Sequence, residues 1–407
     1  MINKIKLKSE FSKNVITLMF GTTIAQMIPM LISPILTRIY TPEDFGTYAV
    51  FLSVLAILSP IATLRYEQAI MLPKKSKSAL ELFHGTFYIL GCMTVLITFF
   101  ILLFNSYLPL DPILISILPL AIFILGFINV NLAFLNRKKS YKKMSHITIV
   151  TSLSNAILNI GVGLFFHSPL VLSGNIILAR LLSMRFIIKS TIKLFNIKVS
   201  LQNIYIRLCE YNDMLKFSTP TVLIAALNRE SIVVFLTYFF DPVLAGGYFL
   251  VQRIFGTPIS MFSASYSNVF FKEFTISKTR KNLLVHTWLK LFAFTLPFAF
   301  VIYVYMYDIL IFIFGTEWKF SAQIAQILLP LFAINFIFSS TSRAHVTLRM
   351  QHFSMIFTIF SFFARVIIFM YGYYTNNPLE VIKLLVFYDI LQIIFMNFLA
   401  FRRIKDD

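Results

Sequence analysis

Long apolar stretches alternate with short polar segments along the whole chain. A helix of about 20 residues is long enough to cross the roughly 30 Å hydrocarbon core of a bilayer. The pattern predicts twelve spanning helices, at residues 14–36, 44–64, 82–104, 113–135, 145–166, 168–188, 216–239, 243–270, 286–307, 321–341, 353–372 and 380–400. A basic segment precedes the first stretch, which has no small-residue cleavage site, so we expect it to be a span and not a removable signal peptide.

Composition supports a polytopic membrane protein. Of 407 residues, 58% are hydrophobic and 13% are charged, and the mean hydropathy is +0.80. Soluble domains have about 45–50% apolar and about 25% charged residues. These values exclude a soluble enzyme, a secreted domain and a disordered chain.

The net charge of +19 follows from topology. With both termini placed in the cytoplasm, the predicted spans put 28 Lys and Arg residues on the inner side and three on the outer side. Cytoplasmic loops of membrane proteins carry such an excess of Lys and Arg. The charge therefore predicts orientation and does not require a nucleic-acid partner.

An internal repeat divides the chain in two. Residues 40–48 resemble residues 240–248 at an offset of 200, with aromatic, Pro, Gly and Tyr positions in common. Six spans is an even number, so the two halves have the same orientation and we expect a pseudo-two-fold axis along the membrane normal. The predicted domains are a six-helix bundle at 1–188, a linker at 189–215 and a second six-helix bundle at 216–407.

The linker contains an amphipathic pattern. Apolar residues recur on one helical face at Leu201, Ile204, Tyr205, Leu208 and Leu215, and charged residues occupy other faces. This pattern is typical of a helix lying in the headgroup plane, here on the cytoplasmic side.

Charged residues deep in the spans are the main functional candidates. Arg180, Arg229, Arg253 and Arg365 are predicted near mid-depth, where an arginine costs roughly 2.5–3.5 kcal/mol on insertion scales. Glu230 is the only carboxylate that we place at similar depth, so a hydrated, cationic interior is expected. The planar guanidinium matches phosphate bidentately, which favours an anion-binding path.

Structural pairing between helices, for example of Glu230 with Arg253, is the alternative explanation for any single arginine. Arg229 and Glu230 are adjacent and therefore about 100° apart on one helix, so we do not expect them to pair with each other. Glu230 is also a weaker candidate for coupling to a proton or sodium ion.

Motifs for catalysis are missing from the sequence. It has no Gly-rich phosphate loop, no zinc-protease or metal-ligand spacing and no long outer loop. We therefore expect a protein that is not an enzyme and that needs no metal or cofactor.

Three motifs resemble a known family. They lie at residues 36–48, 61–67 and 314–318, and read LTRIYTPEDFGTY, IATLRYE and FGTEW. They are similar to motifs of the polysaccharide flippases, the O-antigen and capsule repeat-unit transporters. These belong to the multidrug/oligosaccharidyl-lipid/polysaccharide exporter superfamily.

The resemblance implies an all-α membrane fold of two six-helix bundles around a central cavity. It also implies a substrate, a polyprenyl-diphosphate-linked oligosaccharide that is moved from the inner to the outer leaflet of the bacterial inner membrane by alternating access. A polysaccharide polymerase and chain-length proteins are then possible partners. A drug or cation exporter of the same fold, a membrane glycosyltransferase or O-antigen polymerase, and a structural membrane protein are the alternatives.

Overall fold

The computed structural model is helical throughout, and no strand occurs in the residues that it describes, which are 2–277, 279–348 and 350–404. Side chains are described from Thr17 onward, except at residues 351 and 352. A helix satisfies its own backbone hydrogen bonds, which a segment surrounded by hydrocarbon requires. The all-α prediction is therefore confirmed. Lys278, Arg349 and Lys405, which we assigned to the inner side, lie outside the described residues.

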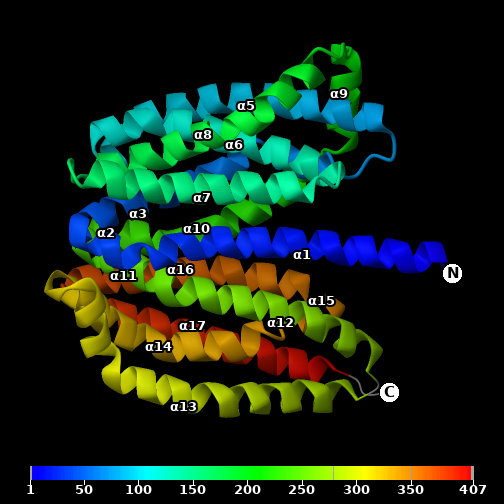
Figure 1. Ribbon diagram of the computed structural model, residues 1–407. Coiled ribbons are helices and arrows are strands. Elements are labelled where there is room, and N and C mark those ends of the chain that lie inside the picture. Colours follow the sequence, from blue (N-terminus) through cyan, green and yellow to red (C-terminus); the bar gives the residue numbers. More distant parts are fainter. Residues whose placement is uncertain (1, 278, 349, 405–407) are drawn as a thin grey trace. The chain divides into compact units, whose positions relative to one another are not determined.

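The chain forms two compact units. The first contains Met1–Tyr40 and Val50–Glu230, and the second contains Thr41–Ala49 and Ser231–Asp407. The helices of the first unit, two of which continue into the second, are α1 (Ile2–Leu31), α2 (Ser33–Ile39), α3 (Pro42–Ala62), α4 (Tyr66–Ala69), α5 (Ser76–Leu103), η1 (Asn105–Tyr107), α6 (Pro112–Arg137), α7 (Tyr141–Gly163), α8 (Pro169–Phe195), α9 (Leu201–Glu210), η2 (Met214–Ser218) and α10 (Thr219–Phe239). Figure 1 shows α5 to α8 running alongside one another.

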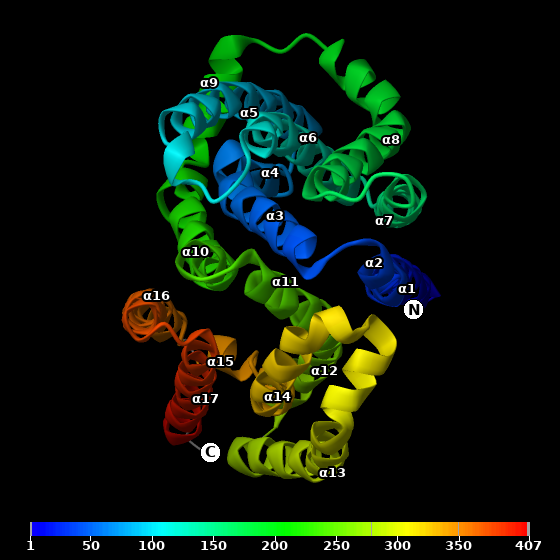
Figure 2. The same ribbon diagram turned by 90° about the vertical axis from the view of Figure 1, so that its left-hand side faces the viewer.

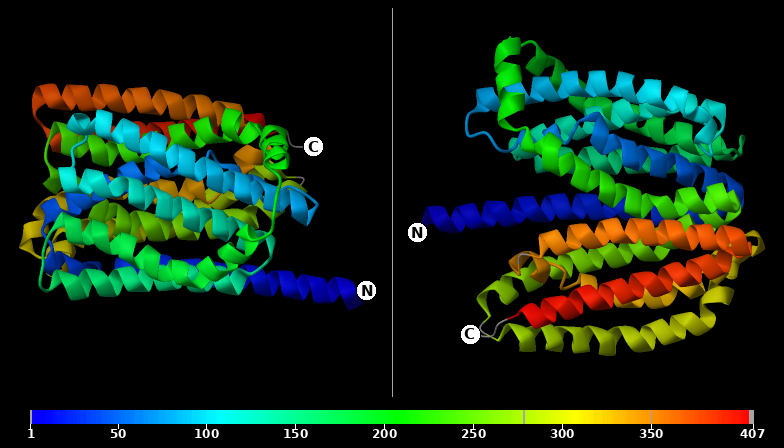
Figure 3. Two further views of the ribbon diagram at one scale, coloured as in Figure 1. Left: turned by 90° about the horizontal axis from the view of Figure 1, so that it is seen from above. Right: turned by 180° about the vertical axis from the view of Figure 1, so that it is seen from behind.

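The second unit is arranged around α14. Its remaining helices are α11 (Pro242–Val251), η3 (Gln252–Gly256), α12 (Thr257–Ile276), α13 (Arg280–Phe314), η4 (Thr316–Trp318), α14 (Lys319–Ser339), α15 (Ala344–Thr347), α16 (Gln351–Thr375) and α17 (Pro378–Arg403). Helix α14 packs against α11, α12, α13 and α17, and Figure 2 shows it between α12, α13 and α17. Helices α16 and α17 lie side by side (Figure 3).

Eleven helical segments among the described residues are long and apolar enough to cross a membrane. Each overlaps one predicted span, and the prediction at 243–270 has no counterpart among them. In that region a π turn, η3, separates the ten-residue α11 from α12, and α12 carries Ser260, Ser263 and Ser267. The count of twelve is not confirmed, because the segment 243–270 carries polar residues and is divided by η3 into two helices. The cytoplasmic position of both termini stays a prediction.

Small residues bring α1 and α7 together. A Cβ added to Gly21 would lie 2.3 Å from Cβ of Ser145, so the two backbones approach closely. The hydroxyl of Ser145 donates to the carbonyl oxygen of Thr17 at 2.9 Å, and that of Ser152 donates to the carbonyl oxygen of Ala25 at 2.5 Å. Close approach at small residues and hydrogen bonds between helices are how helices associate in lipid.

The linker helix α9 packs on α5. Ile204 is buried, and its side chain and that of Leu208 lie over Gly85 of α5. Nε of Arg207 donates to Oε2 of Glu81 at 2.9 Å, so an ion pair also holds α9 against α5. An amphipathic helix at this position is confirmed, and its place in the headgroup plane stays a prediction. Helix α9 belongs to the first compact unit, and the predicted domain boundaries at 189–215 stay a prediction.

The repeat appears as two helix starts that touch. Helices α3 and α11 begin at the aligned prolines, Pro42 and Pro242. A Cβ added to Gly46 would lie 1.9 Å from the carbonyl oxygen of Pro242, and one added to Gly246 would lie 2.0 Å from that of Pro42. The contact is reciprocal, as a local two-fold relation between the two segments requires. Only glycine fits at either position, because the neighbouring atom is backbone.

Candidate functional site

The first charged site lies on α10. Nε of Arg229 donates to Oε1 of Glu230 at 2.7 Å, and the hydroxyl of Ser53 on α3 donates to the other carboxylate oxygen at 3.1 Å. The side chain of Arg229 is 72% exposed and that of Glu230 is 19% exposed. Glu230 is therefore held by two donors, whereas the guanidinium stays accessible.

Our prediction that Arg229 and Glu230 do not pair was wrong. It used only the directions in which adjacent Cβ atoms leave the helix. Arginine has a long, flexible stem, so its guanidinium can reach back to a neighbouring carboxylate even when the two Cβ atoms diverge.

The second charged site joins α16 to α17. Nη2 of Arg365 lies 2.9 Å from Oδ1 and 3.1 Å from Oδ2 of Asp389. The two side chains are only 10% and 16% exposed. Charge-assisted bonds of this kind are about twice as strong as neutral ones. The pair therefore links two spanning helices in the interior of the second unit.

Our assumption that Glu230 was the only deep carboxylate was also wrong. Asp389 lies in the middle of α17, at the same depth as Arg365 on α16. The sequence contained the signal, since Asp389 falls within the predicted span 380–400. Its partner was not visible, because 24 residues and a turn separate it from Arg365.

Polar neighbours extend the Arg365–Asp389 pair. The hydroxyl of Ser361 donates to Oε1 of Gln392 at 2.7 Å, and the hydroxyl of Tyr388 donates to Ser361 at 3.3 Å. Ser361 lies one turn before Arg365 on α16, and Gln392 lies one turn after Asp389 on α17. Residues three or four apart share a helix face, so both helices present a polar stripe to each other.

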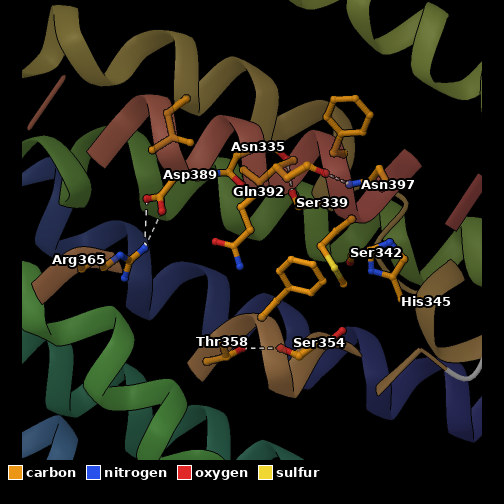
Figure 4. A pocket seen from close by; sticks show the side chains of 15 residues that line it. Asn335, Ser339, Ser342, His345, Ser354, Thr358, Arg365, Asp389, Gln392 and Asn397 are labelled. Atoms are coloured by element: carbon orange, nitrogen blue, oxygen red, sulfur yellow. Dashed lines mark hydrogen bonds and ion pairs between the residues drawn. The ribbon is translucent and has the colours of Figure 1, made fainter. Parts of the chain in front are cut away.

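This polar stripe continues into a cavity of about 390 Å³, which we call the α14–α17 cavity. It lies between the C-terminal half of α14, the segment 342–345, α16 and the C-terminal half of α17 (Figure 4). Its polar lining consists of Asn335, Ser339, Ser342, His345, Ser354, Thr358, Arg365, Asp389, Gln392 and Asn397. A polar cavity of this size is unusual in an apolar bundle and points to a function.

A second cavity, of about 370 Å³, lies against α14, η3 and α12, and we call it the α12–α14 cavity. Ser260 and Ser263 of α12 line it, and it shares Leu331, Asn335, Ser339 and Ser342 with the α14–α17 cavity. Ser263 Oγ is buried in this cavity and has no hydrogen-bond partner among the described residues.

Burial lowers the pKa of His345, which lies between α14 and α16 outside the spanning segments, and a hydrogen bond with Asn397 opposes that shift. This histidine is therefore neutral at pH 7. With Arg365 neutralised by Asp389, the lining of the α14–α17 cavity has no net charge.

The remaining predicted residues are distributed over both units. Arg180 lies on α8 and, like Arg229 and Glu230, belongs to the first unit. Arg253 lies in the π turn η3 and, like Arg365, belongs to the second unit. Single π turns inside helices are frequent at functional sites. No group of three or more His, Cys, Asp or Glu that could hold a metal ion occurs in the part of the chain searched.

Comparison with known proteins identifies the family. Residues 35–323 match the family described as polysaccharide biosynthesis protein. The chain belongs to this family. The matched range includes Arg180, Arg229, Glu230 and Arg253 and ends before the Arg365–Asp389 pair. No curated protein sequence matches the chain.

Solved structures share the fold of this polysaccharide biosynthesis protein. The lipid II flippase MurJ in an inward closed conformation is similar with a TM-score of 0.67 and 13% identity, over 96% of this chain and 89% of that chain. A MATE transporter in complex with MaD3S is similar with a TM-score of 0.59 and 14% identity, over 96% of this chain and 95% of that chain.

An outward-facing MATE transporter of the MOP superfamily gives a TM-score of 0.53 at 15% identity, over 95% of this chain and 93% of that chain. The prediction of a MATE-like fold is confirmed. Family and fold together support a multi-pass membrane transporter.

Proposed function

We propose that this polysaccharide biosynthesis protein moves a polyprenyl-diphosphate-linked oligosaccharide from the inner to the outer leaflet of the bacterial inner membrane by alternating access. The family is one of polysaccharide biosynthesis, and one protein with the same fold is a lipid II flippase. Sugar hydroxyls cannot enter hydrocarbon without losing their hydrogen bonds, so such a cargo needs a hydrated path through protein. A membrane transporter of this family would provide such a hydrated path.

The observation that carries the proposal is Arg229. Its side chain is 72% exposed in a helix that is long and apolar enough to span the membrane, where an arginine facing lipid would cost roughly 2.5–3.5 kcal/mol on insertion scales. A water-filled path removes that cost. An accessible guanidinium in such a path would bind the diphosphate with its planar fork.

The three other predicted arginines differ in how well they could bind phosphate. Arg180 and Arg253 are further candidates for the phosphate path. Arg365 is the least suited of the four, because both carboxylate oxygens of Asp389 already occupy its Nη2. An inside-negative potential would favour outward movement of the anionic cargo, by about 2.3 kcal/mol per charge per 100 mV.

Glu230 gives this path a means of coupling to an ion. Its carboxylate accepts hydrogen bonds from Arg229 and Ser53. Binding of a proton there would weaken the attraction for Arg229 and leave the guanidinium more available to phosphate. Sodium binding at the same carboxylate would have the same effect on charge.

A drug or cation exporter is the second candidate, because MATE transporters share the fold. Organic cations need accessible carboxylates. Glu230 and Asp389, however, are each already paired with an arginine.

Gene deletion followed by lipid extraction tests the proposed function. We expect polyprenyl-linked oligosaccharide to accumulate in the deleted strain and to disappear on complementation with the intact gene. Arg229→Ala should fail to complement, while the control Arg185→Ala, on α8, should complement. Absence of the accumulated lipid, together with increased sensitivity to ethidium, would instead favour the cation exporter.

A further inference from the structure

The α14–α17 cavity is strongly polar and yet electrically balanced. Arg365 and Asp389 form an ion pair in its wall, and His345 at its other end is neutral at pH 7. A diphosphate entering this cavity would find its one guanidinium already bound to a carboxylate. A metal cation would find one carboxylate, beside an arginine. The charge balance therefore disfavours both kinds of ion and favours a neutral ligand.

The lining offers hydrogen bonds that the described residues leave unused. Oε1 of Gln392 accepts from Ser361, but its two amide N–H donors find no partner in the described part of the chain. The carboxamide of Asn335 likewise makes no hydrogen bond with any described residue. Figure 4 shows Gln392 extending from α17 into the space between α17 and α16. Groups of this kind, placed in a cavity, are what a ligand with many hydroxyls needs.

Apolar surface faces the same space. Phe338 of α14 and Phe357 of α16 both line the α14–α17 cavity. A pyranose ring has hydroxyls around its edge and C–H groups on its faces, so it needs amides at the rim and apolar side chains above or below. The volume of about 390 Å³ lies within the range of small-molecule sites.

We propose that the α14–α17 cavity is a sugar-binding site, which holds a neutral pyranose ring of the cargo through Asn335, Gln392 and the Asp389 carboxylate. This inference rests on the proposed function and adds to it a second recognition site, separate from the arginine that binds the diphosphate. Asp389 accepts from sugar hydroxyls while it remains paired with Arg365. The α12–α14 cavity, which shares Asn335 and contains the buried hydroxyl of Ser263, extends the same polar surface.

Calorimetric titration of the purified full-length protein tests this site with two probes. The first is the oligosaccharide released by mild acid from the lipid that accumulates in the deletion strain. The second is undecaprenyl diphosphate without sugar. We expect Asn335→Leu and Gln392→Leu each to weaken oligosaccharide binding by tenfold or more, and to leave binding of undecaprenyl diphosphate within twofold of the wild type.

Gln326→Leu is the matched control, because it makes the same kind of change on α14 outside both cavities and should affect neither probe. Ser354→Ala, a milder change in the lining, should weaken oligosaccharide binding two- to fivefold and serves if a leucine variant does not fold. Inorganic diphosphate should not compete with the oligosaccharide.

Three results would overturn the sugar site while leaving the proposed function intact. They are unchanged oligosaccharide binding by the cavity variants, binding of undecaprenyl diphosphate but not of oligosaccharide by the wild type, and competition by diphosphate. Failure of the wild type to bind either probe would contradict the proposed function as well.

Discussion

In the part of the chain that the structure describes, an arginine–carboxylate pair lies in a spanning helix of the first unit and another joins two spanning helices of the second. Arg229 and Glu230 are neighbours on one helix, and the arginine side chain is 72% exposed. Arg365 and Asp389 come from two helices, make two contacts at 2.9 and 3.1 Å, and are 10% and 16% exposed. The guanidinium group therefore occurs in an accessible and in a buried setting, whereas both carboxylates are largely buried, at 19% and 16% exposed.

The difference teaches that the residue types alone do not assign a role. A buried charge that loses its partner retains the cost of desolvation, so a buried pair is a strict structural constraint. A pair with an exposed guanidinium contributes about 0–1 kcal/mol, and that guanidinium remains available to a ligand. We therefore assign a structural role to the ion pair of Arg365 with Asp389 and a binding role to Arg229.

The largest expected effect comes from breaking the buried pair. Arg365→Leu or Asp389→Leu alone should lower the free energy of unfolding by about 3–5 kcal/mol, because each leaves one unpaired charge in the bundle. The double variant should be much closer to the wild type. Denaturation of the purified proteins in detergent measures this. A double variant as unstable as the sum of the singles would show that the pair is not the relevant interaction.

A smaller loss is expected when the accessible arginine is removed. Arg229→Ala should reduce transport of lipid-linked oligosaccharide by at least about tenfold, equivalent to about 1.4 kcal/mol. Its free energy of unfolding should fall by less than about 1 kcal/mol. Arg229→Lys should restore only part of the transport, because lysine lacks the planar fork. Flipping assays in proteoliposomes measure this, and full activity of Arg229→Ala would remove the basis of the diphosphate path.

Neutralising Glu230 separates its role as the ion-pair partner of Arg229 from its proposed role in coupling transport to an ion. We expect Glu230→Gln to change stability by less than about 1 kcal/mol, since the partner Arg229 is exposed and the glutamine carbonyl oxygen can still accept from Ser53. Transport by this variant should lose its dependence on an imposed pH gradient if a proton couples there. The same assay with a sodium gradient tests the other ion. Asp389→Asn is the matched change in the buried pair, and a loss of coupling there instead would reverse the two assignments.

The smallest effect concerns His345, at the end of the α14–α17 cavity away from the buried pair. Burial lowers its pKa in the folded state, while in the unfolded chain the pKa is about 6.5. The contribution of neutral His345 to the free energy of unfolding is therefore fully present above about pH 6.5. It is lost as the pH drops through the folded pKa, with a slope of up to about 1.4 kcal/mol per pH unit. Unfolding midpoints from pH 7.5 to 5.5 measure this. His345→Gln should flatten the curve, and an unchanged curve would contradict the inference.

Hydropathy was enough to predict eleven spans because each contains an apolar helical stretch long enough to cross the bilayer. It was insufficient at 243–270, where a π turn and several serines interrupt the helix. A π turn depends on packing and on inserted residues, and apolar periodicity does not encode it.

The candidate site was predicted in part. Depth along a helix located Arg229 and Arg365, because it follows from counting residues at about 1.5 Å each. Partners did not follow from counting. The partner of Arg229 was missed because it depends on a rotamer, and that of Arg365 because it depends on how α16 packs against α17.

The sequence by itself determined that this chain is a helical membrane protein with a repeated plan, since the hydrophobic effect and the backbone's need for hydrogen bonds act on local stretches. It also marked the positions where α3 and α11 begin. Only the tertiary structure decided that Gly46 and Gly246 meet the opposite backbone, that Asp389 neutralises Arg365, and that a balanced polar cavity lies beside them. These features join residues that are distant in the chain, and their energies depend on a few ångströms of approach between helices.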